Sequence, residues 1–385
     1  MAAPKLRFKE FDGDWSQSKI GEIFQVTSGS TPLRSDNRFF ENADIAWVKT
    51  TDLNNGLIEK TEEKISQIAL KETSVKILPK GTVFVAMYGG FNQIGRTGLL
   101  VHEAACNQAL SAIYPNEKID SYFLLTFLNH KVDDWKNFAA SSRKDPNITK
   151  SDVLAFPLKY PVKEEQTKIA SFLSAVDEKI SQLTQKHELL SQYKKGMMQK
   201  LFSQQIRFKA DDGSEFGEWE ETELGKHCQI KTGKLDANAM RPNGEFRFYT
   251  CAKEFYLIDE YAFDTEALLI SGNGANVGYI HYYKGKFNAY QRTYVLDQWQ
   301  QNIIFIQYFL EQFLKERIYG EKKEGNTPYI VLSTLSEMPL LLPCLEEQTK
   351  IANFLSSIDQ KIEVVAQQIE QAKQWKKGLL QNMFI

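Results

Sequence analysis

The seven residues EEQTKIA occur twice in this chain, at 164–170 and again at 346–352. The likeness continues downstream without a gap, since EEQTKIASFLSAVDEKISQL aligns with EEQTKIANFLSSIDQKIEVV and each copy closes on Lys-Lys-Gly. A fainter echo lies upstream, where RFKEFDGDW at 7–15 resembles RFKADDGSEFGEW at 207–219. An internal repeat constrains the fold first, because each copy has to form the same structural unit. This period is too long for a solenoid, so we expect two equivalent domains.

The repeated segment has the pattern of a long helix. Apolar residues follow one another at steps of four and three, which is the a/d pattern of a heptad. Pro161 and Pro343 stand just ahead of the two copies, and paired glutamates place negative charge at the positive end of each helix dipole. A helix of about 36–39 residues would be about 55 Å long.

Two matching stripes in one chain favour mutual pairing, and a tandem repeat packs most simply about a pseudo-twofold axis. We therefore predict an antiparallel coiled coil. Lys194 and Lys376 occupy a positions, where polar residues usually fix the register. The residues predicted to pair are Ile169, Leu173, Val176, Ile180 and Leu183 in the first copy, and Ile351, Leu355, Ile358, Ile362 and Val365 in the second.

The segments before the helices differ far more from each other. Short β-branched and aromatic runs separated by Gly and Asn turns predict β-rich domains, with helices near 121–132 and 303–317. The predicted fold is α+β, with two mixed β-rich domains separated by two long antiparallel helices. The predicted boundaries are 1–160 for the first domain, 161–205 for the first helix, 206–342 for the second domain and 343–385 for the second helix.

Composition excludes some classes. A net charge of −2 argues against a generic polyanion binder, so any nucleic-acid surface has to be a local patch. No apolar run approaches the roughly 18–20 residues that span a bilayer, and the N-terminus lacks a signal-peptide core. The four cysteines form no close pair. We expect a cytoplasmic protein without membrane contact and with reduced cysteines.

Three segments mimic enzyme motifs. The first, GFNQIGRT, resembles a P-loop, but Arg96 replaces its lysine and a strand-like segment follows. The glycine loop from Gly272 to Gly278 is also followed by a strand-like YIHYY, so it lacks the helix that would hold a phosphate. The third, NTPY from Asn326 to Tyr329, is one residue away from the Asn-Pro-Pro-Tyr loop of amino-methyltransferases. No catalytic residue and no metal ligand is predicted, because the histidines are scattered.

The combination resembles the specificity subunit of type I restriction-modification systems. Two variable domains are each followed by a Pro-x-x-Glu-Glu-Gln-x-x-Ile-Ala helix ending in Lys-Lys-Gly. SGSTP at 28–32 and DIAWVKTTDL at 44–53 look like motifs of that family, with Ala46 in place of the usual proline. In the second domain TGKLDAN at 232–238 and GKFNAYQR at 285–292 look like family motifs too.

This resemblance implies a non-catalytic subunit that reads double-stranded DNA, each target recognition domain contacting one half of a bipartite, asymmetric site. The paired helices would set the spacing and dock two modification (methyltransferase) subunits, which carry S-adenosylmethionine and methylate adenine. Two restriction subunits with ATP and magnesium would complete the complex, and this subunit itself would hold no cofactor. A spacer of about 55 Å corresponds to about 16 base pairs.

Candidate DNA contacts are basic, amide and small polar side chains on expected loops, because phosphates need Lys or Arg and base edges need Arg, Lys, Asn, Gln or small polar groups. In the first domain they are Thr31, Arg34, Lys49, Asn92, Gln93, Arg96, Arg143 and Lys144. In the second they are Lys231, Lys234, Arg241, Asn273, Asn276, Lys284, Gln291 and Arg292.

Two alternatives stay open at this point. One is a solitary adenine methyltransferase built on the loop from Gly272 to Gly278 and on Asn326 to Tyr329. The other is a coiled-coil adaptor without a role in DNA binding.

Overall fold

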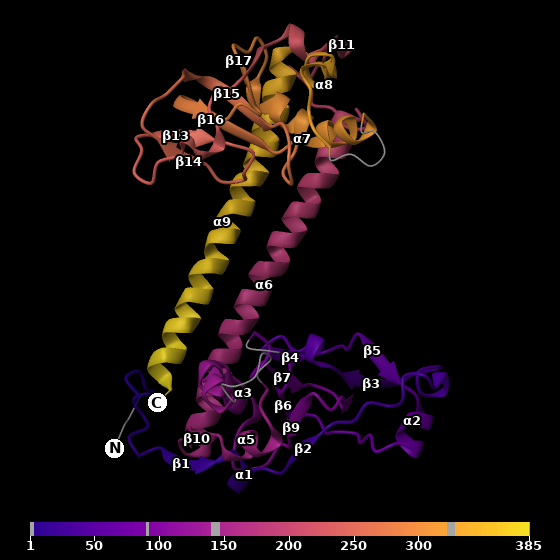
Figure 1. The fold of residues 1–385 in the computed structure, drawn as a ribbon, viewed down its shortest axis with the longest axis vertical. Helices are drawn as coiled ribbons and strands as arrows, with labels where there is room; N and C mark the ends of the chain where they lie inside the picture. Colours follow the sequence, from indigo (N-terminus) through magenta and orange to yellow (C-terminus); the bar gives the residue numbers. More distant parts are fainter. Residues whose placement is uncertain (1–3, 90–91, 140–146, 322–327, 385) are drawn as a thin grey trace. The chain divides into compact units, whose positions relative to one another are not determined.

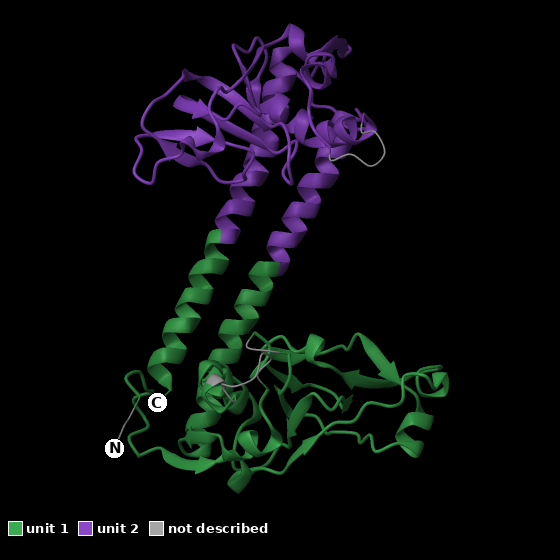
Figure 2. Ribbon diagram, in the orientation of Figure 1, with its two compact units in different colours: residues 1–184, 367–385 green, residues 185–366 purple. Residues whose placement is uncertain are grey.

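The computed structural model describes residues 4–89, 92–139, 147–321 and 328–384. The chain divides into two compact units, residues 1–184 with 367–385 (unit 1) and residues 185–366 (unit 2), coloured separately in Figure 2. Each unit contains a β-rich domain together with part of both long helices. Among the described residues, none of the helices has the length and apolar character needed to cross a membrane.

Among the residues that the structure describes, unit 1 contains three sheets, with strand orders β2-β9-β6-β7-β4, β5-β3-β8 and β1-β10. Most of these strands are labelled in Figure 1. All its pairings are antiparallel except β3 with β8 and β4 with β7. The strands are β1 (Ser16–Lys19), β2 (Val26–Ser28), β3 (Ile45–Val48), β4 (Gly56–Ile58), β5 (Glu63–Ile65), β6 (Val83–Ala86), β7 (Thr97–Leu100), β8 (Ala105–Cys106), β9 (Leu110–Ile113) and β10 (Pro157–Tyr160).

The helices of this domain are short. The longest, α3, starts after Asp120, whose carboxylate accepts hydrogen bonds from the backbone N–H groups of Tyr122 and Phe123 and so caps the helix. The helices are α1 (Ile20–Ile23), α2 (Gln67–Glu72), α3 (Ser121–His130), α4 (Trp135–Phe138) and α5 (Lys150–Ala155).

The central strands β6, β7 and β9 of the five-stranded sheet in unit 1 are buried on both faces. Successive side chains of a strand point to opposite faces. Accordingly Val83 and Val85 of β6 face the core formed with α3, α5 and the long helices, while Phe84 and Ala86 face a second, smaller core. The centre of this sheet is therefore enclosed between two hydrophobic cores.

Unit 2 contains a six-stranded sheet of order β12-β17-β15-β16-β13-β14 and a two-stranded sheet β11-β18. Among the described strand pairs of the large sheet, β13 with β16 is the parallel one. The strands are β11 (Glu220–Glu223), β12 (Gln229–Thr232), β13 (Phe246–Tyr249), β14 (Tyr256–Ile258), β15 (Phe263–Ser271), β16 (Ile280–Ala289), β17 (Thr293–Asp297) and β18 (Pro339–Leu342).

The pairing in unit 2 repeats that of unit 1. In unit 2 the long strand β16 pairs antiparallel with β15 through its first part and parallel with β13 through its last residues. In unit 1 two shorter strands make the same pairs, since β7 pairs antiparallel with β6 and β8 pairs parallel with β3. Helix α7 (Ile303–Gly320) is capped by Asn302 and packs its apolar side on Leu268 and Ile270 of the sheet. Helix α8 (Leu332–Ser336) precedes β18.

The two long helices are α6 (Lys163–Phe202) and α9 (Leu345–Met383), of 40 and 39 residues. In unit 1 the beginning of α6 shares a core with the end of α9, and in unit 2 the beginning of α9 shares a core with the end of α6. The helices are therefore antiparallel within each unit, and the predicted α+β fold with two β-rich domains is confirmed.

Gly95 and Gly278 occupy matching places of the repeat and form the same turn. Both glycines have positive φ, +79° and +80°. The N–H of Gly95 donates to Ala86 O at 3.0 Å and the N–H of Gly278 to Ser271 O at 2.8 Å. A Cβ at Gly95 would lie 2.4 Å from the Trp135 ring, so glycine is required there for space as well as for backbone conformation.

Candidate nucleic-acid interface

The repeated EEQ residues attach each domain to the start of its long helix. In unit 1 the fully buried carboxylate of Glu165 accepts two hydrogen bonds from the Arg7 guanidinium, at 2.8 and 2.7 Å. In unit 2 Glu347 accepts the same pair from Arg207, at 3.1 and 2.8 Å. This explains both duplicated motifs at once, because RFK supplies the arginine and EEQ supplies the carboxylate.

The glutamine of the motif serves the next connection. Gln166 donates to Pro161 O at 2.9 Å and accepts from the N–H of Asp120, the residue that caps α3. Gln348 donates to Pro343 O at 2.9 Å and accepts from the N–H of Asn302, the residue that caps α7. The second glutamate and the glutamine of the repeated motif thus make their hydrogen bonds within the unit.

An aspartate links three helices in unit 1. Asp177 on α6 accepts a hydrogen bond from the hydroxyl of Tyr122 on α3 at 2.6 Å and pairs with Lys376 on α9 at 2.5 Å. Burial, followed by this hydrogen bond, raises the pKa of Tyr122. The phenol therefore stays protonated and serves as a donor.

Unit 2 contains the same arrangement. Asp359 on α9 accepts from Tyr308 on α7 at 2.5 Å and pairs with Lys194 on α6 at 2.8 Å. Burial and then the hydrogen bond to Asp359 raise the pKa of Tyr308. Lys194 and Lys376, expected to fix the register of the helix pair, thus each bind an aspartate of the opposite helix within one unit.

The residues predicted to pair the helices lie mostly in these cores. Ile169, Leu173 and Val176 are buried in unit 1 together with residues of α3 and α5, so they contact the domain as well as the second helix. In unit 2, Ile351, Leu355 and Ile358 are buried with α7 in the same way. Of the others, Leu183 and Val365 are buried, and Ile180 and Ile362 are partly buried against the two cores.

At one end of the unit 2 sheet the loops are fixed by backbone hydrogen bonds. The N–H of Gly272 donates to Arg292 O at 2.9 Å, and the N–H of Ile330 donates to Gly272 O at 2.8 Å. The amide of Gln291 donates to Asp236 at 2.9 Å. A cavity of about 310 Å³ opens here and is lined by Gly272, Gln291, Arg292, Tyr294, Tyr329 and Ile330.

Unit 1 has the same frame at the corresponding end. The N–H of Met87 donates to Ala109 O at 2.9 Å, and the N–H of Ile148 donates to Met87 O at 3.0 Å. Thr31 contacts Gln108, the counterpart of Gln291 in the repeat. The backbone frame is shared, but Ala109 stands where unit 2 presents the exposed Arg292.

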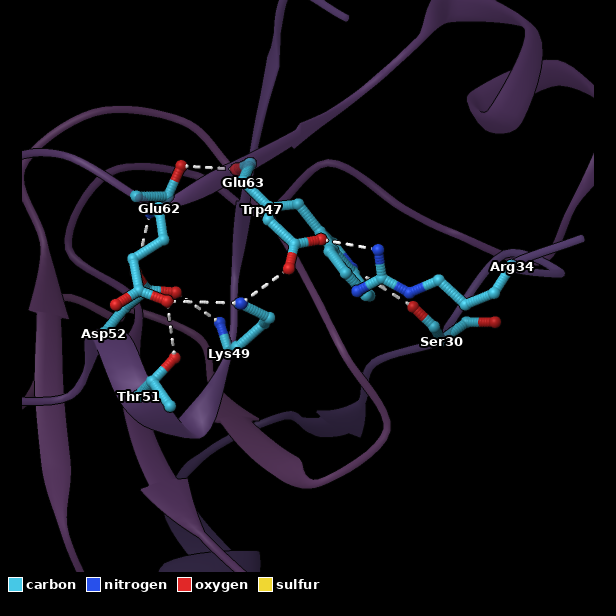
Figure 3. A network of polar contacts seen from close by, with 9 residues as sticks. Ser30, Arg34, Trp47, Lys49, Thr51, Asp52, Glu62 and Glu63 are labelled. Atoms are coloured by element: carbon cyan, nitrogen blue, oxygen red, sulfur yellow. Dashed lines mark hydrogen bonds and ion pairs between the residues drawn. The ribbon is translucent and has the colours of Figure 1, made fainter. Parts of the chain in front are cut away.

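A charged cluster lies at the end of the three-stranded sheet of unit 1 (Figure 3). The carboxylate of Glu63 binds Lys49 with one oxygen at 2.7 Å and Arg34 with the other at 2.6 Å. These hydrogen bonds, that from Arg34 first, lower the pKa of Glu63. The bond to Glu63 is also the main cause that raises the pKa of Lys49. Glu63 thus stays deprotonated and Lys49 stays protonated at neutral pH.

The remaining side of this cluster is acidic. Lys49 also lies 3.2 Å from Glu62, which accepts a hydrogen bond from Thr51 at 3.1 Å. Asp52 accepts from the backbone N–H groups of Lys49 and Glu62. The Lys49 side chain is only 18% exposed, and Figure 3 shows its ammonium group between the two glutamates.

Of the other candidates in unit 1, Asn92 is exposed, and Gln93 accepts a hydrogen bond from Arg96 at 2.8 Å. Arg143 and Lys144 lie outside the described residues. In unit 2, Lys234, Gln291 and Arg292 are exposed around the loop end, whereas Asn276 donates to Cys251 O at 3.0 Å and supports the loop.

Four further candidates belong to other parts of unit 2 or to its loop. Asn273 is half-buried in the glycine loop. The others are exposed and paired with acids: Lys231 with Asp297, Lys284 with Glu266, and Arg241 with Asp259. The structure therefore brings only part of the predicted set to one loop end.

One residue that was not predicted has a distinctive setting. The Arg247 guanidinium lies over two rings, 4.3 Å from the centroid of Phe255 and 4.6 Å from that of Tyr283. The signal available in the sequence was the alternation of arginine and aromatic residues in FRFY, which also fits a buried strand. Gln108 was not among the candidates either, although it contacts Thr31 and matches Gln291 in the repeat.

The glycine loop at 272–278 lies between the antiparallel strands β15 and β16, so no helix starts at its end. This confirms the expected strand after the loop. Asn326 lies outside the described residues, while Tyr329 is 61% exposed at the rim of the cavity. Among the described residues, no group of three or more His, Cys, Asp or Glu could hold a metal ion.

The type I restriction modification DNA specificity domain matches this chain twice, at residues 12–192 and 217–374. The chain belongs to this family. Relatives named as specificity subunits of type I restriction enzymes include EcoDI of Escherichia coli, 38% identical over 165 residues that span 43% of this chain and 36% of that protein. MjaIX of Methanocaldococcus jannaschii is 25% identical over 98% of this chain and 96% of that protein.

Two solved structures have the same fold. The S subunit of a type I restriction-modification system from M. genitalium matches with a TM-score of 0.68 and 19% identity, over 100% of this chain and 99% of that chain. A chain from a study of complex assembly and conformational transition of the type I R-M system matches with a TM-score of 0.59 and 18% identity, over 97% and 98% of the two chains.

Proposed function

We propose that this chain is the sequence-specific DNA-recognition subunit of a type I restriction-modification complex. Each β-rich domain reads one half of a bipartite, asymmetric target, and the paired helices set the spacing and dock the modification subunits. The chain itself is not catalytic. Two modification subunits carry S-adenosylmethionine, and two restriction subunits carry ATP and magnesium.

The observation that carries this proposal is a shared backbone frame with different side chains. Met87 and Gly272 make the same two backbone hydrogen bonds at the loop end, yet the residues beside that frame are Ala109 in unit 1 and Arg292 in unit 2. Because base edges are read by side chains while the fold sets their position, two such domains select two different half-sites.

The docking role is supported by two exposed aromatic residues at equivalent positions of the helix repeat. Tyr193 on α6 is 51% exposed and Trp375 on α9 is 54% exposed. Exposed Trp and Tyr side chains are frequent energetic centres of protein interfaces. Two equivalent aromatic residues fit two copies of one partner.

The recognition claim is tested by mapping adenine methylation in a host that expresses the complete system. We expect one bipartite, asymmetric motif with two different halves. A single continuous motif, or methylation without any sequence preference, contradicts the proposal and leaves the adaptor alternative in place.

The methyltransferase alternative is tested by calorimetry of the isolated chain with S-adenosylmethionine. Because no helix follows the glycine loop, we expect no binding. Binding that is lost in a Gly274→Asp variant would instead favour the alternative.

Docking is tested by co-purification with the modification subunit. Trp375→Ala and Tyr193→Ala together should reduce recovery of the partner strongly, whereas Gln374→Ala, an exposed neighbour on the same helix, should not. Equal recovery in all variants removes the aromatic pair from the dock.

A further inference from the structure

Arg34 stands out among the candidate DNA contacts because its side chain is fixed and still exposed. It is 53% exposed, although it carries an ion pair. Its guanidinium carbon lies 4.7 Å from the ring centroid of Phe40 and 5.0 Å from that of Trp47. A guanidinium that lies against two aromatic rings and pairs with a carboxylate has little rotational freedom left to lose on binding.

The hydrogen bonds of Arg34 leave most of its donors available. A guanidinium has five N–H donors. Within the described part of the chain, the ion pair of Arg34 uses one terminal nitrogen, Nη1, against Glu63. The other N–H groups are open to a ligand.

The nearby Arg38 provides an instructive contrast. It is 57% exposed, but its Nε and Nη2 both donate to the Asp36 carboxylate, at 3.0 and 2.7 Å, and Nη2 also lies 3.3 Å from Glu72. Its forked edge is therefore occupied, whereas that of Arg34 is not. Two arginines of similar exposure and charge thus differ in what they can still bind.

The charge around Arg34 disfavours a phosphate as its ligand. Arg34 and Lys49 share the carboxylate of Glu63, and Glu62 lies on the far side of Lys49. A phosphate contact depends on net positive charge. A base contact depends on the direction of the donors, which the rings and Glu63 fix.

The loop that carries Arg34 is anchored to the sheet next to the loop end described above. The N–H of Ser30 donates to Cys106 O at 3.0 Å, and the indole N–H of Trp47 donates to Ser30 O at 3.2 Å, a contact drawn in Figure 3. Thr31 follows directly and contacts Gln108.

We infer that Arg34 reads a guanine in the half-site of unit 1, an inference that rests on the proposed DNA-recognition function. Lys49 and Glu63 are positioning residues for Arg34. Guanine presents O6 and N7 in the major groove, two acceptors that match the fork of a guanidinium. Lys49 holds one oxygen of Glu63 so that the other faces Arg34. Lys49 acts within the domain in this account and does not contact phosphate.

The test is a selection of DNA sequences from a random pool by the complex reconstituted with its modification subunits. Wild type is compared with Arg34→Ala and with the matched control Arg38→Ala. Arg34→Ala should lose roughly 5- to 150-fold of discrimination at one base pair, the range typical of a single bidentate contact. That pair should be G·C in the wild-type motif, and Arg38→Ala should leave every position unchanged.

Further outcomes decide between the roles of these residues. Loss of selectivity across the whole half-site indicates a structural role for Arg34 and overturns the inference, as does no change at any position or a change at an A·T pair. A wild-type complex that selects no motif refutes the proposed function itself, and this inference with it.

Glu63 is tested through the same base pair. Glu63→Ala should reduce discrimination at the position that Arg34→Ala affects, and Glu63→Gln, which keeps a hydrogen-bond acceptor, should restore part of it. If Glu63→Ala changes other positions instead, Glu63 does not act through Arg34.

Discussion

At the scale of single residues, the repeated charged side chains have internal partners. Asp177 and Asp359 each bind a tyrosine of the domain helix and a lysine of the opposite long helix. A domain and two helices are thus tied at one carboxylate. Substitution of any one of these residues should therefore lower the stability of its unit.

We predict that Lys376→Met destabilises unit 1 by about 1–3 kcal/mol, because a partly buried carboxylate loses a charged hydrogen-bond partner. Lys377→Met is the control, since Lys377 is an exposed neighbour on the same helix. Urea unfolding followed by circular dichroism measures the difference. Equal midpoints for the two variants contradict the role given to Lys376.

The pH dependence of unit 1 should involve His130. Its ring stacks on Phe384 at 5.7 Å, and burial lowers the pKa of the imidazole below its ordinary value of 6.5. The unfolded chain therefore binds the proton more readily than the folded one. The contribution of neutral His130 to the stability of the fold is complete above about pH 6.5 and is lost as the pH falls through the folded pKa. The melting temperature of the wild type should fall as the pH is lowered from about 7 to below the folded pKa of His130, and that of His130→Phe should fall less. The same slope for both proteins contradicts this.

At the scale of elements, each long helix is fixed at its first turn. Glu165 and Glu347 are fully buried carboxylates that each bind one arginine with two hydrogen bonds. Removing one partner of a buried ion pair lowers stability far more than replacing both partners by apolar residues. The start of each helix is therefore where the domain is most sensitive to substitution.

Accordingly Arg7→Ala should destabilise unit 1 by about 3–5 kcal/mol, and Glu165→Gln in the same chain should recover part of that loss, because the unpaired charge is removed. Chemical unfolding of the single and double variants measures both effects. Lys9→Ala, at an exposed residue of the same segment, serves as the control. A double variant less stable than Arg7→Ala would contradict the explanation.

The sequence was sufficient for those elements whose periodicity reflects burial. The long helices follow from their heptad spacing and from the repeat, and helices were also expected near α3 and α7. The surroundings of Lys49 could not be foreseen, because the pairing of β3 with β5 that brings Glu63 beside it is non-local. Candidate contacts chosen by residue type alone therefore mix exposed side chains such as Lys234 with supporting ones such as Asn276.

At the scale of the whole molecule, the repeat explains how one chain can carry the two different recognition surfaces of the proposed function. The contacts that join domain to helix are duplicated residue for residue, from Arg7–Glu165 and Arg207–Glu347 to the two aspartate clusters. The loop ends, in contrast, keep their backbone hydrogen bonds and change their side chains. Attachment and recognition are thus separate properties of the fold, and a domain should be exchangeable without loss of the other half-site.

The most direct measurement is therefore a domain exchange. Residues 12–160 are replaced by the corresponding segment of another family member, with Glu165 and Gln166 kept, and the methylated motif is mapped in a host that carries the complete system. The account predicts that one half of the bipartite motif changes completely while the other half stays the same. A motif that changes in both halves, or in neither, would contradict it.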